Sequence, residues 1–193
     1  MGKGLAMIAV YVPHPAMSIL RQSFQLTESG ESSTERREAV RIGQQAATLA
    51  MEEYASEEQI IATFLHSAAT LLPIDSLRSD LAIESNPEAI LLAWLRCNFG
   101  EKVALPIHLQ SQAMRYLYTT MPSYGVRAER AKLVPMSSKE SRAFKAQSHF
   151  RQSIQVCLWI DRARMIHQET PTCSQFLDFV EEFHERYRTS NAD

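Results

Sequence analysis

Hydrophobic residues recur at spacings of three and four along most of the chain, which is the pattern of amphipathic helices. The spacing predicts helices over these ranges: 15–26, 35–54, 56–72, 87–99, 101–120, a short stretch after 137, 148–166 and 173–188. The stretch 73–85 and the region between Pro122 and Pro135 are expected to be connections, because turn-forming residues interrupt the spacing there. No internal repeat or low-complexity segment is found. The pattern therefore predicts an all-α fold.

Residues that favour helix ends stand at the expected boundaries. Two serines lie three residues before a glutamine or glutamate, the spacing of a capping box, namely Ser56 with Gln59 and Ser137 with Glu140. Asn86 followed by Pro87 is typical of a helix start, and Gly100 of a helix end. Pro106 falls in the first turns of the helix predicted over 101–120, where it is tolerated or causes a kink.

Composition narrows the class of protein. The chain has 193 residues, 45% of them hydrophobic, which is enough for one domain with a substantial core. A net charge of −2 argues against a general nucleic-acid or membrane-surface binder. The three cysteines form neither a CxxC pair nor a zinc-binding pattern, so a reducing cytoplasm is the expected location. The apolar run 5–12 is too short to span a bilayer and is expected to form a short strand or a packed arm.

Several segments, in order along the chain, have the form of known motifs: Gln45–Ala50, Phe64–Leu72, Phe99–Ala104 with Ala113–Leu117, Pro135–Ser137 with Glu140 and Phe144, and Trp159–Arg164 with Pro171. Together they resemble the HD-domain superfamily, and within it the branch of mixed-valent diiron oxygenases that cleave organophosphonates. The resemblance extends over about residues 35–171. The resemblance implies an HD-type helical bundle, with an arm and first helix over 1–34, a degenerate HD domain over 35–171, and a last helix and tail over 172–193.

The resemblance also implies where iron ligands would lie, and most of those positions carry other residues. The family uses four histidines, two aspartates and a tyrosine, and only His66 is kept. The replaced positions are Ile42, Ser67, Pro87, Gln110 and Ile160, with Asp161 matching the second acid of the last motif, and no tyrosine occurs in 27–42. On the substrate side, Met114 replaces a lysine and Thr70 replaces a further histidine.

The candidate site is therefore a vestigial pocket formed by His66, Ser67, Thr70, Gln110, Met114 and Asp161. His66 is expected to bond a backbone carbonyl or the Ser67 hydroxyl, because buried imidazoles generally find partners. Gln110 is expected to fill the former metal position. His108 stands two residues earlier on a predicted helix, about 200° away, and is expected to point elsewhere.

Two irons need imidazole and carboxylate ligands, and isoleucine or proline side chains offer no lone pair. The leading hypothesis is a pseudoenzyme without cofactor. It would bind a small molecule in the vacated pocket, or a protein partner such as an active homologue or a second copy. The alternative is a metal-dependent oxygenase or phosphohydrolase with an atypical site that uses His66, Gln110, Asp161 and Asp75 or Asp80. A third reading is a helical adaptor without a usable pocket.

Overall fold

The computed structural model describes residues 14–28, 32–74, 77, 86–121, 124 and 133–191. Within these residues every regular element is a helix, so the all-α prediction is confirmed. The helices are α1 (Pro15–Glu28), α2 (Thr34–Glu52), α3 (Glu57–Phe64), the 3₁₀ turn η1 (Leu65–Ser67), α4 (Ala68–Leu71), α5 (Pro87–Phe99), α6 (Glu101–His108), α7 (Gln110–Thr120), α9 (Ser138–Lys145), α10 (Phe150–Ala163) and α11 (Cys173–Ser190). The apolar run 5–12, Asp75 and Asp80 lie outside the described residues.

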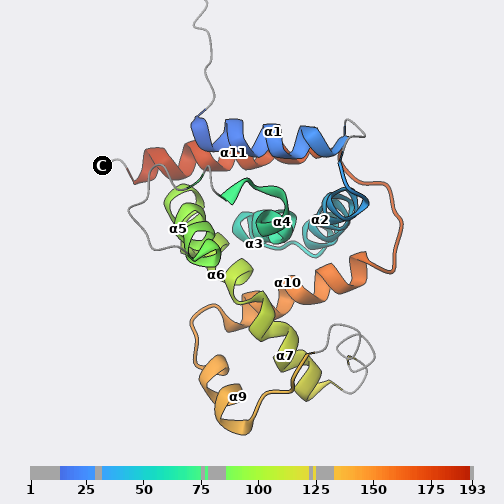
Figure 1. Ribbon diagram of the computed structural model, residues 1–193, viewed down its shortest axis with the longest axis vertical. Helices are drawn as coiled ribbons and strands as arrows, with labels where there is room; N and C mark the ends of the chain where they lie inside the picture. The colour runs from blue at the N-terminus through green and yellow to red at the C-terminus, as the bar shows by residue number, and fades with distance from the viewer. Residues whose placement is uncertain are drawn as a thin grey trace, which may run out of the picture.

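The first and last helices lie side by side and close one end of the bundle (Figure 1). Beneath them lie α2, α3 and α4, flanked by α5 and α6, while α10 packs across α2 and α3. The far end of the molecule is formed by α7 and α9. None of the described helices is both long and apolar enough to cross a bilayer.

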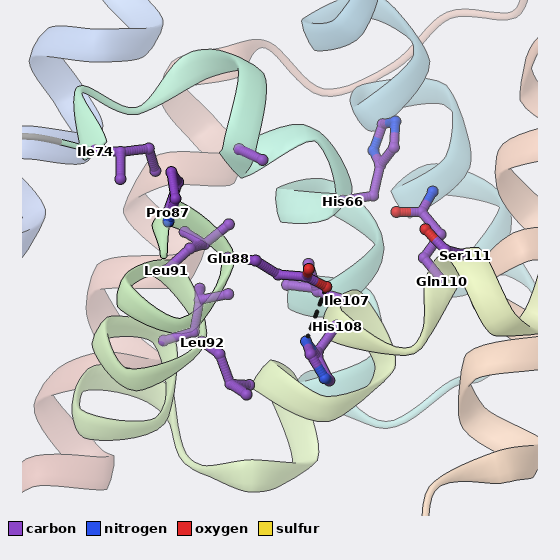
Figure 2. Close-up of a pocket in the computed structure, with 12 residues that line it drawn as sticks. His66, Ile74, Pro87, Glu88, Leu91, Leu92, Ile107, His108, Gln110 and Ser111 are labelled. Carbon is purple, nitrogen blue, oxygen red and sulfur yellow. Dashed lines mark ion pairs between the residues drawn. The ribbon is translucent and has the colours of Figure 1, made fainter. Parts of the chain in front are cut away.

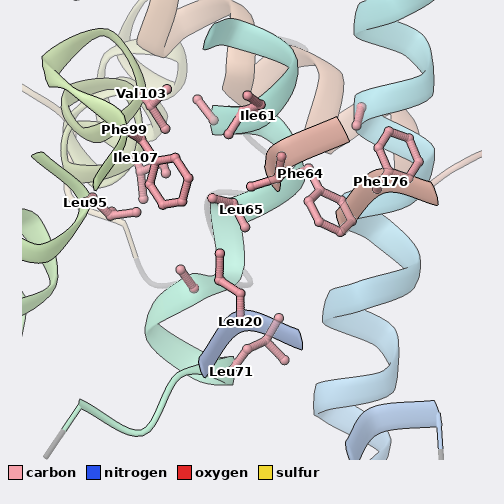
Figure 3. Packing of buried hydrophobic residues seen from close by; sticks show 14 of the residues in the cluster. Leu20, Ile61, Phe64, Leu65, Leu71, Leu95, Phe99, Val103, Ile107 and Phe176 are labelled. Atoms are coloured by element: carbon pink, nitrogen blue, oxygen red, sulfur yellow. The ribbon is translucent and has the colours of Figure 1, made fainter. Parts of the chain in front are cut away.

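The main apolar core joins helices from both ends of the chain (Figure 3). Phe64 of α3 stacks between Phe24 of α1 and Phe176 of α11, with ring centroids 5.1 and 4.9 Å away. Burying such rings stabilises a fold by several kcal/mol in total, at about 25 cal/mol per Å² of apolar area. The ring stack therefore attaches α1 and α11 to the middle of the bundle.

A second, smaller apolar cluster holds α7, α9 and α10 together. Its centre is an aromatic triad of Tyr116, Phe144 and Phe150, with ring centroids between 5.0 and 5.7 Å apart. The edge-on contacts of Phe150 are among the favoured geometries for aromatic pairs. This cluster fixes the start of α7, which borders the candidate site.

The predicted helix ends are largely confirmed. Ser137 and Glu140 form a full capping box, and Asn86 Oδ1 accepts the backbone N–H of Glu88 just before α5. Ser56 Oγ accepts the N–H of Gln59, and Gly100 ends α5 with φ of 80°. A further capping box, which the sequence reading did not identify, joins Thr172 to Gln175 at the start of α11.

The helix predicted over 56–72 is broken at the candidate histidine, which corrects the sequence reading. After α3 the backbone tightens into η1, and Ser67 has φ of −100° and ψ of 19°. His66 Nδ1 lies 3.0 Å from the Thr63 carbonyl oxygen, which in a continuous α-helix would accept the N–H of Ser67. The side chain thus competes with the helix for that carbonyl.

The helix predicted over 101–120 is also broken. It divides into α6 and α7 at Leu109, one turn after Pro106. Proline removes a helical N–H and crowds the preceding turn, so an irregularity near it is expected. The change of direction at Leu109 decides which side chains of this segment face the candidate site.

Candidate functional site

A cavity of about 380 Å³ lies between η1, α5 and the junction of α6 with α7 (Figure 2). Small-molecule pockets typically measure about 300–1,000 Å³, so its size suits a small ligand. Its wall is mostly apolar with a few polar groups, and consists of His66, Ala69, Ile74, Pro87, Glu88, Leu91, Leu92, Leu95, Ile107, His108, Gln110 and Ser111. Two of the sequence-predicted site residues, His66 and Gln110, are among them.

Both ring nitrogens of His66 are engaged by neighbouring groups. Nδ1 donates its proton to the Thr63 carbonyl oxygen at 3.0 Å, because a carbonyl only accepts. That tautomer leaves a lone pair on Nε2, which accepts the Ser67 hydroxyl at 2.8 Å. The prediction of a carbonyl or Ser67 partner is confirmed, and both partners are present.

Burial also keeps this imidazole neutral. His66 is 7% exposed, and its pKa is lowered to about 4 by loss of solvation, with the Arg164 charge adding a smaller effect. The bond to Thr63 acts the other way and is too weak to restore the pKa. At neutral pH the site therefore carries no positive charge on His66.

A glycine of α2 sets the position of this ring. A Cβ built on Gly43 would lie 2.8 Å from the Phe64 carbonyl oxygen and 3.7 Å from Nδ1 and Cε1 of His66. Only a residue without a side chain allows α2 to approach η1 this closely. Figure 2 shows the His66 ring turned toward the ribbon of α2 and away from the pair formed by Glu88 and His108.

The opposite wall brings together residues that the sequence reading kept apart. His108 lines the same cavity as Gln110, although a continuous helix would have placed them about 200° apart. The expectation failed because the helix is broken at Leu109 between them. His108 Nδ1 lies 3.4 Å from Glu88 Oε1, so this pair links α6 to α5 at the cavity (Figure 2).

The other predicted site residues lie elsewhere. Ser67 bonds His66 without lining the cavity, and Thr70 is exposed. Met114 packs against the second apolar cluster. Asp161 lines a different cavity of about 670 Å³, next to Arg162. The structure therefore brings His66 and Gln110 into one cavity wall and places Ser67 beside His66, while Thr70, Met114 and Asp161 are not part of that wall.

The residues present do not fit the dinuclear iron centre that the resemblance implies. Ile42 and Ile160 are buried in the apolar core at 4% and 3% exposure, and Pro87 offers no donor atom. Within the described ranges, no three side chains of His, Cys, Asp or Glu lie close enough together to hold a metal ion. The Nε2 lone pair that would face a metal is occupied by the Ser67 hydroxyl.

The 2.8 Å distance between Ser67 Oγ and His66 Nε2 is that of a catalytic nucleophile and its general base, but the surroundings of the pair indicate a structural role. A base works best with a pKa near the working pH, and this imidazole has a pKa of about 4. Ser67 is not part of the cavity wall, so a substrate held there would not meet its hydroxyl. The contact instead satisfies a buried ring nitrogen.

Sequence reasoning pointed to the α5 side of the cavity only through Pro87, and it missed the other α5 residues there, for which a signal existed. Glu88, Leu91, Leu92 and Leu95 stand at i, i+3, i+4 and i+7, which places them on one helix face. Trp94 of the same helix turns into the core. From the sequence alone, that helix face is typical of ordinary core packing, and its place in the cavity wall is clear only once the position of α6 is known.

The fold and site together describe an all-α bundle with a mostly apolar cavity walled by a neutral histidine. No model of a known protein family matches the chain, and no curated protein is found to be similar to it. The resemblance to the HD superfamily therefore stays a prediction from the sequence segments described above.

Proposed function

We propose that this protein is a degenerate HD-type protein that binds a small molecule in the cavity between α5 and the α6–α7 junction and performs no metal-dependent catalysis. The observation that carries this proposal is the state of His66. The one ligand kept from the family pattern stands in the cavity wall, neutral, with both nitrogens bonded to the protein. Such a histidine shapes a pocket and is not free to hold a metal.

The cavity favours a ligand-binding protein over the hypothesis of a helical adaptor without a usable pocket. A structural adaptor needs no pocket between its helices, and apolar side chains left beside water instead of packed together forgo stability, at about 25 cal/mol per Å². Here a cavity of about 380 Å³ is bordered by leucines together with Glu88, His108 and Gln110. Apolar walls with a few convergent polar groups are the usual composition of ligand pockets.

The proposal is tested by a thermal-shift screen of small molecules on the wild-type protein and on Leu92→Trp. Leu92 is partly buried in the cavity wall, so a larger side chain there takes up the ligand's space. We expect some compounds to raise the wild-type melting temperature by several degrees. A free ligand concentration of about 100 times Kd adds about 2.7 kcal/mol to the free energy of unfolding. The same compounds should have little effect on Leu92→Trp.

Leu158→Trp is the matched control, because Leu158 lines the other cavity and is also partly buried. It should respond to the compounds as the wild type does. A screen in which no compound stabilises the wild type, or in which Leu92→Trp and wild type respond equally, contradicts the proposed site.

A further inference from the structure

The electrostatic character of the cavity limits which ligands it accepts. Among the described residues of its wall there is no lysine or arginine, and the carboxylate is that of Glu88. His66 is neutral, since burial lowers its pKa to about 4. His108 is paired with Glu88 at 3.4 Å, so any positive charge on its ring is already matched by a carboxylate.

Two described arginines close to the His66 segment serve other contacts. Arg36 donates to the Leu71 carbonyl oxygen at 2.6 Å, and it is not in the cavity wall. Arg164 acts on His66 through its charge and is likewise absent from the wall. From the described wall residues, an anion would gain no partner of opposite charge in return for the water that it loses, which is costly.

The wall is also divided into an apolar side and a polar end. In Figure 2, Ile74, Leu91 and Leu92 lie on one side of the cavity, and Gln110 and Ser111 lie on the other beside His66. The Gln110 side chain is an amide, which can donate to and accept from a ligand's polar group.

From this arrangement we propose that the cavity selects an uncharged, largely apolar molecule with one polar end that meets Gln110, and that it rejects anions. This inference rests on the proposed binding function and names its ligand class. Glu88 adds a repulsion of negative head groups that solvent partly screens, because its side chain is 67% exposed and lies beside His108. The leucines of α5 contribute by holding an apolar tail.

The test uses ligands with the same tail and different head groups: octanamide, octanoate and octylphosphonate. Isothermal titration calorimetry near neutral pH should show octanamide binding most tightly. Octanoate should bind at least about tenfold more weakly and octylphosphonate more weakly still, because each added charge loses water against a mostly apolar wall.

Two variants separate the contributions of the polar groups. Glu88→Gln removes the carboxylate and should reduce the ratio of the dissociation constants of octanoate and octanamide by several-fold. Gln110→Leu keeps similar bulk and should weaken octanamide by about tenfold, as a lost hydrogen bond in a buried site costs about that much. Glu52→Gln, in the wall of the other cavity, is the control and should change neither affinity.

The outcomes distinguish this inference from the proposed function. If octylphosphonate binds as tightly as octanamide or more tightly, and Leu92→Trp weakens that binding, the proposed ligand class is wrong. The proposed binding function would still hold in that case. Failure of all three ligands to bind at millimolar concentration counts against both.

Discussion

At the scale of single residues, the two hydrogen bonds of His66 define the chemistry of the candidate site. Its partners are the Thr63 carbonyl oxygen and the Ser67 hydroxyl, both within four residues in the chain. Both partners are close in the chain, so the sequence could propose them, and the break in the helix at η1 brings them within reach of the ring. A second histidine, His184, is 1% exposed and forms tilted ring contacts with His14 and Phe99 at centroid distances of 4.7 and 5.6 Å.

These two buried histidines predict how stability depends on pH. The pKa of each is lowered to about 4 in the fold, chiefly by burial, from an ordinary value of 6.5. Below pH 6.5 the unfolded chain takes up protons that the folded protein does not, so the free energy of unfolding falls as pH drops from 6.5 to about 4. For His66 alone the loss is about 3 kcal/mol.

Urea unfolding at a series of pH values checks this expectation. His184→Phe removes one of the two titrating groups while keeping an aromatic ring, so its stability should fall less steeply over this range. The pKa of the Glu53 carboxyl is lowered by its bonds to Arg162 and Trp159, and its contribution is lost only at more acidic pH, below about 4.5. Stability that is constant between pH 7 and 5 would contradict the neutral, buried state of the histidines.

At the scale of helices, close approach of α2 to η1 shapes the site. The Phe64 carbonyl oxygen lies 2.8 Å from the position that a Cβ on Gly43 would take. In an ordinary helix interior, alanine is more favourable than glycine by about 1 kcal/mol. Here that gain is outweighed, because the contact is with backbone, which cannot move aside as a flexible side chain can.

We therefore expect Gly43→Ala to destabilise the protein by about 1–3 kcal/mol, the usual cost of overpacking a core. It should also shift the His66 ring resonances in an NMR spectrum, since the added methyl group lies next to Nδ1 and Cε1. Glu35→Ala, at an exposed position in the first turn of α2, is the control and should cost only a few tenths of a kcal/mol. An increase in the melting temperature of Gly43→Ala would show that α2 and η1 are farther apart than described.

At the scale of the whole molecule, the two apolar clusters and the two cavities decide which candidate residues can act together. α1 and α11 share the main core with the middle helices through Phe24, Phe64 and Phe176. The second cluster, around Phe144, supports α7. The cavity of His66 and Gln110 is separate from the cavity of Asp161, so these residues do not form one site.

This arrangement predicts the metal content of the purified protein. Protein prepared from cells grown in iron-rich medium should contain well below one iron per chain by elemental analysis, because no three His, Cys, Asp or Glu side chains cluster among the described residues. Ser67→Asp places a carboxylate beside His66 and should still not bind iron, since Ile42 and Pro87, where the HD resemblance would place further ligands, offer no side-chain donor atoms. About two tightly bound irons per chain in the wild type would favour the atypical oxygenase or phosphohydrolase instead.

The sequence by itself determined the all-α class and several helix ends, including those at Asn86, Gly100 and Ser137. These features depend on residues a few positions apart, whose spacing and capping bonds are local. Only the tertiary structure decided that His66 and Gln110 share a cavity with Glu88 and His108. The breaks at η1 and Leu109 have local causes, but their effect depends on how closely α2 approaches and on how α5 faces the α6–α7 junction, which are contacts between segments far apart in the chain.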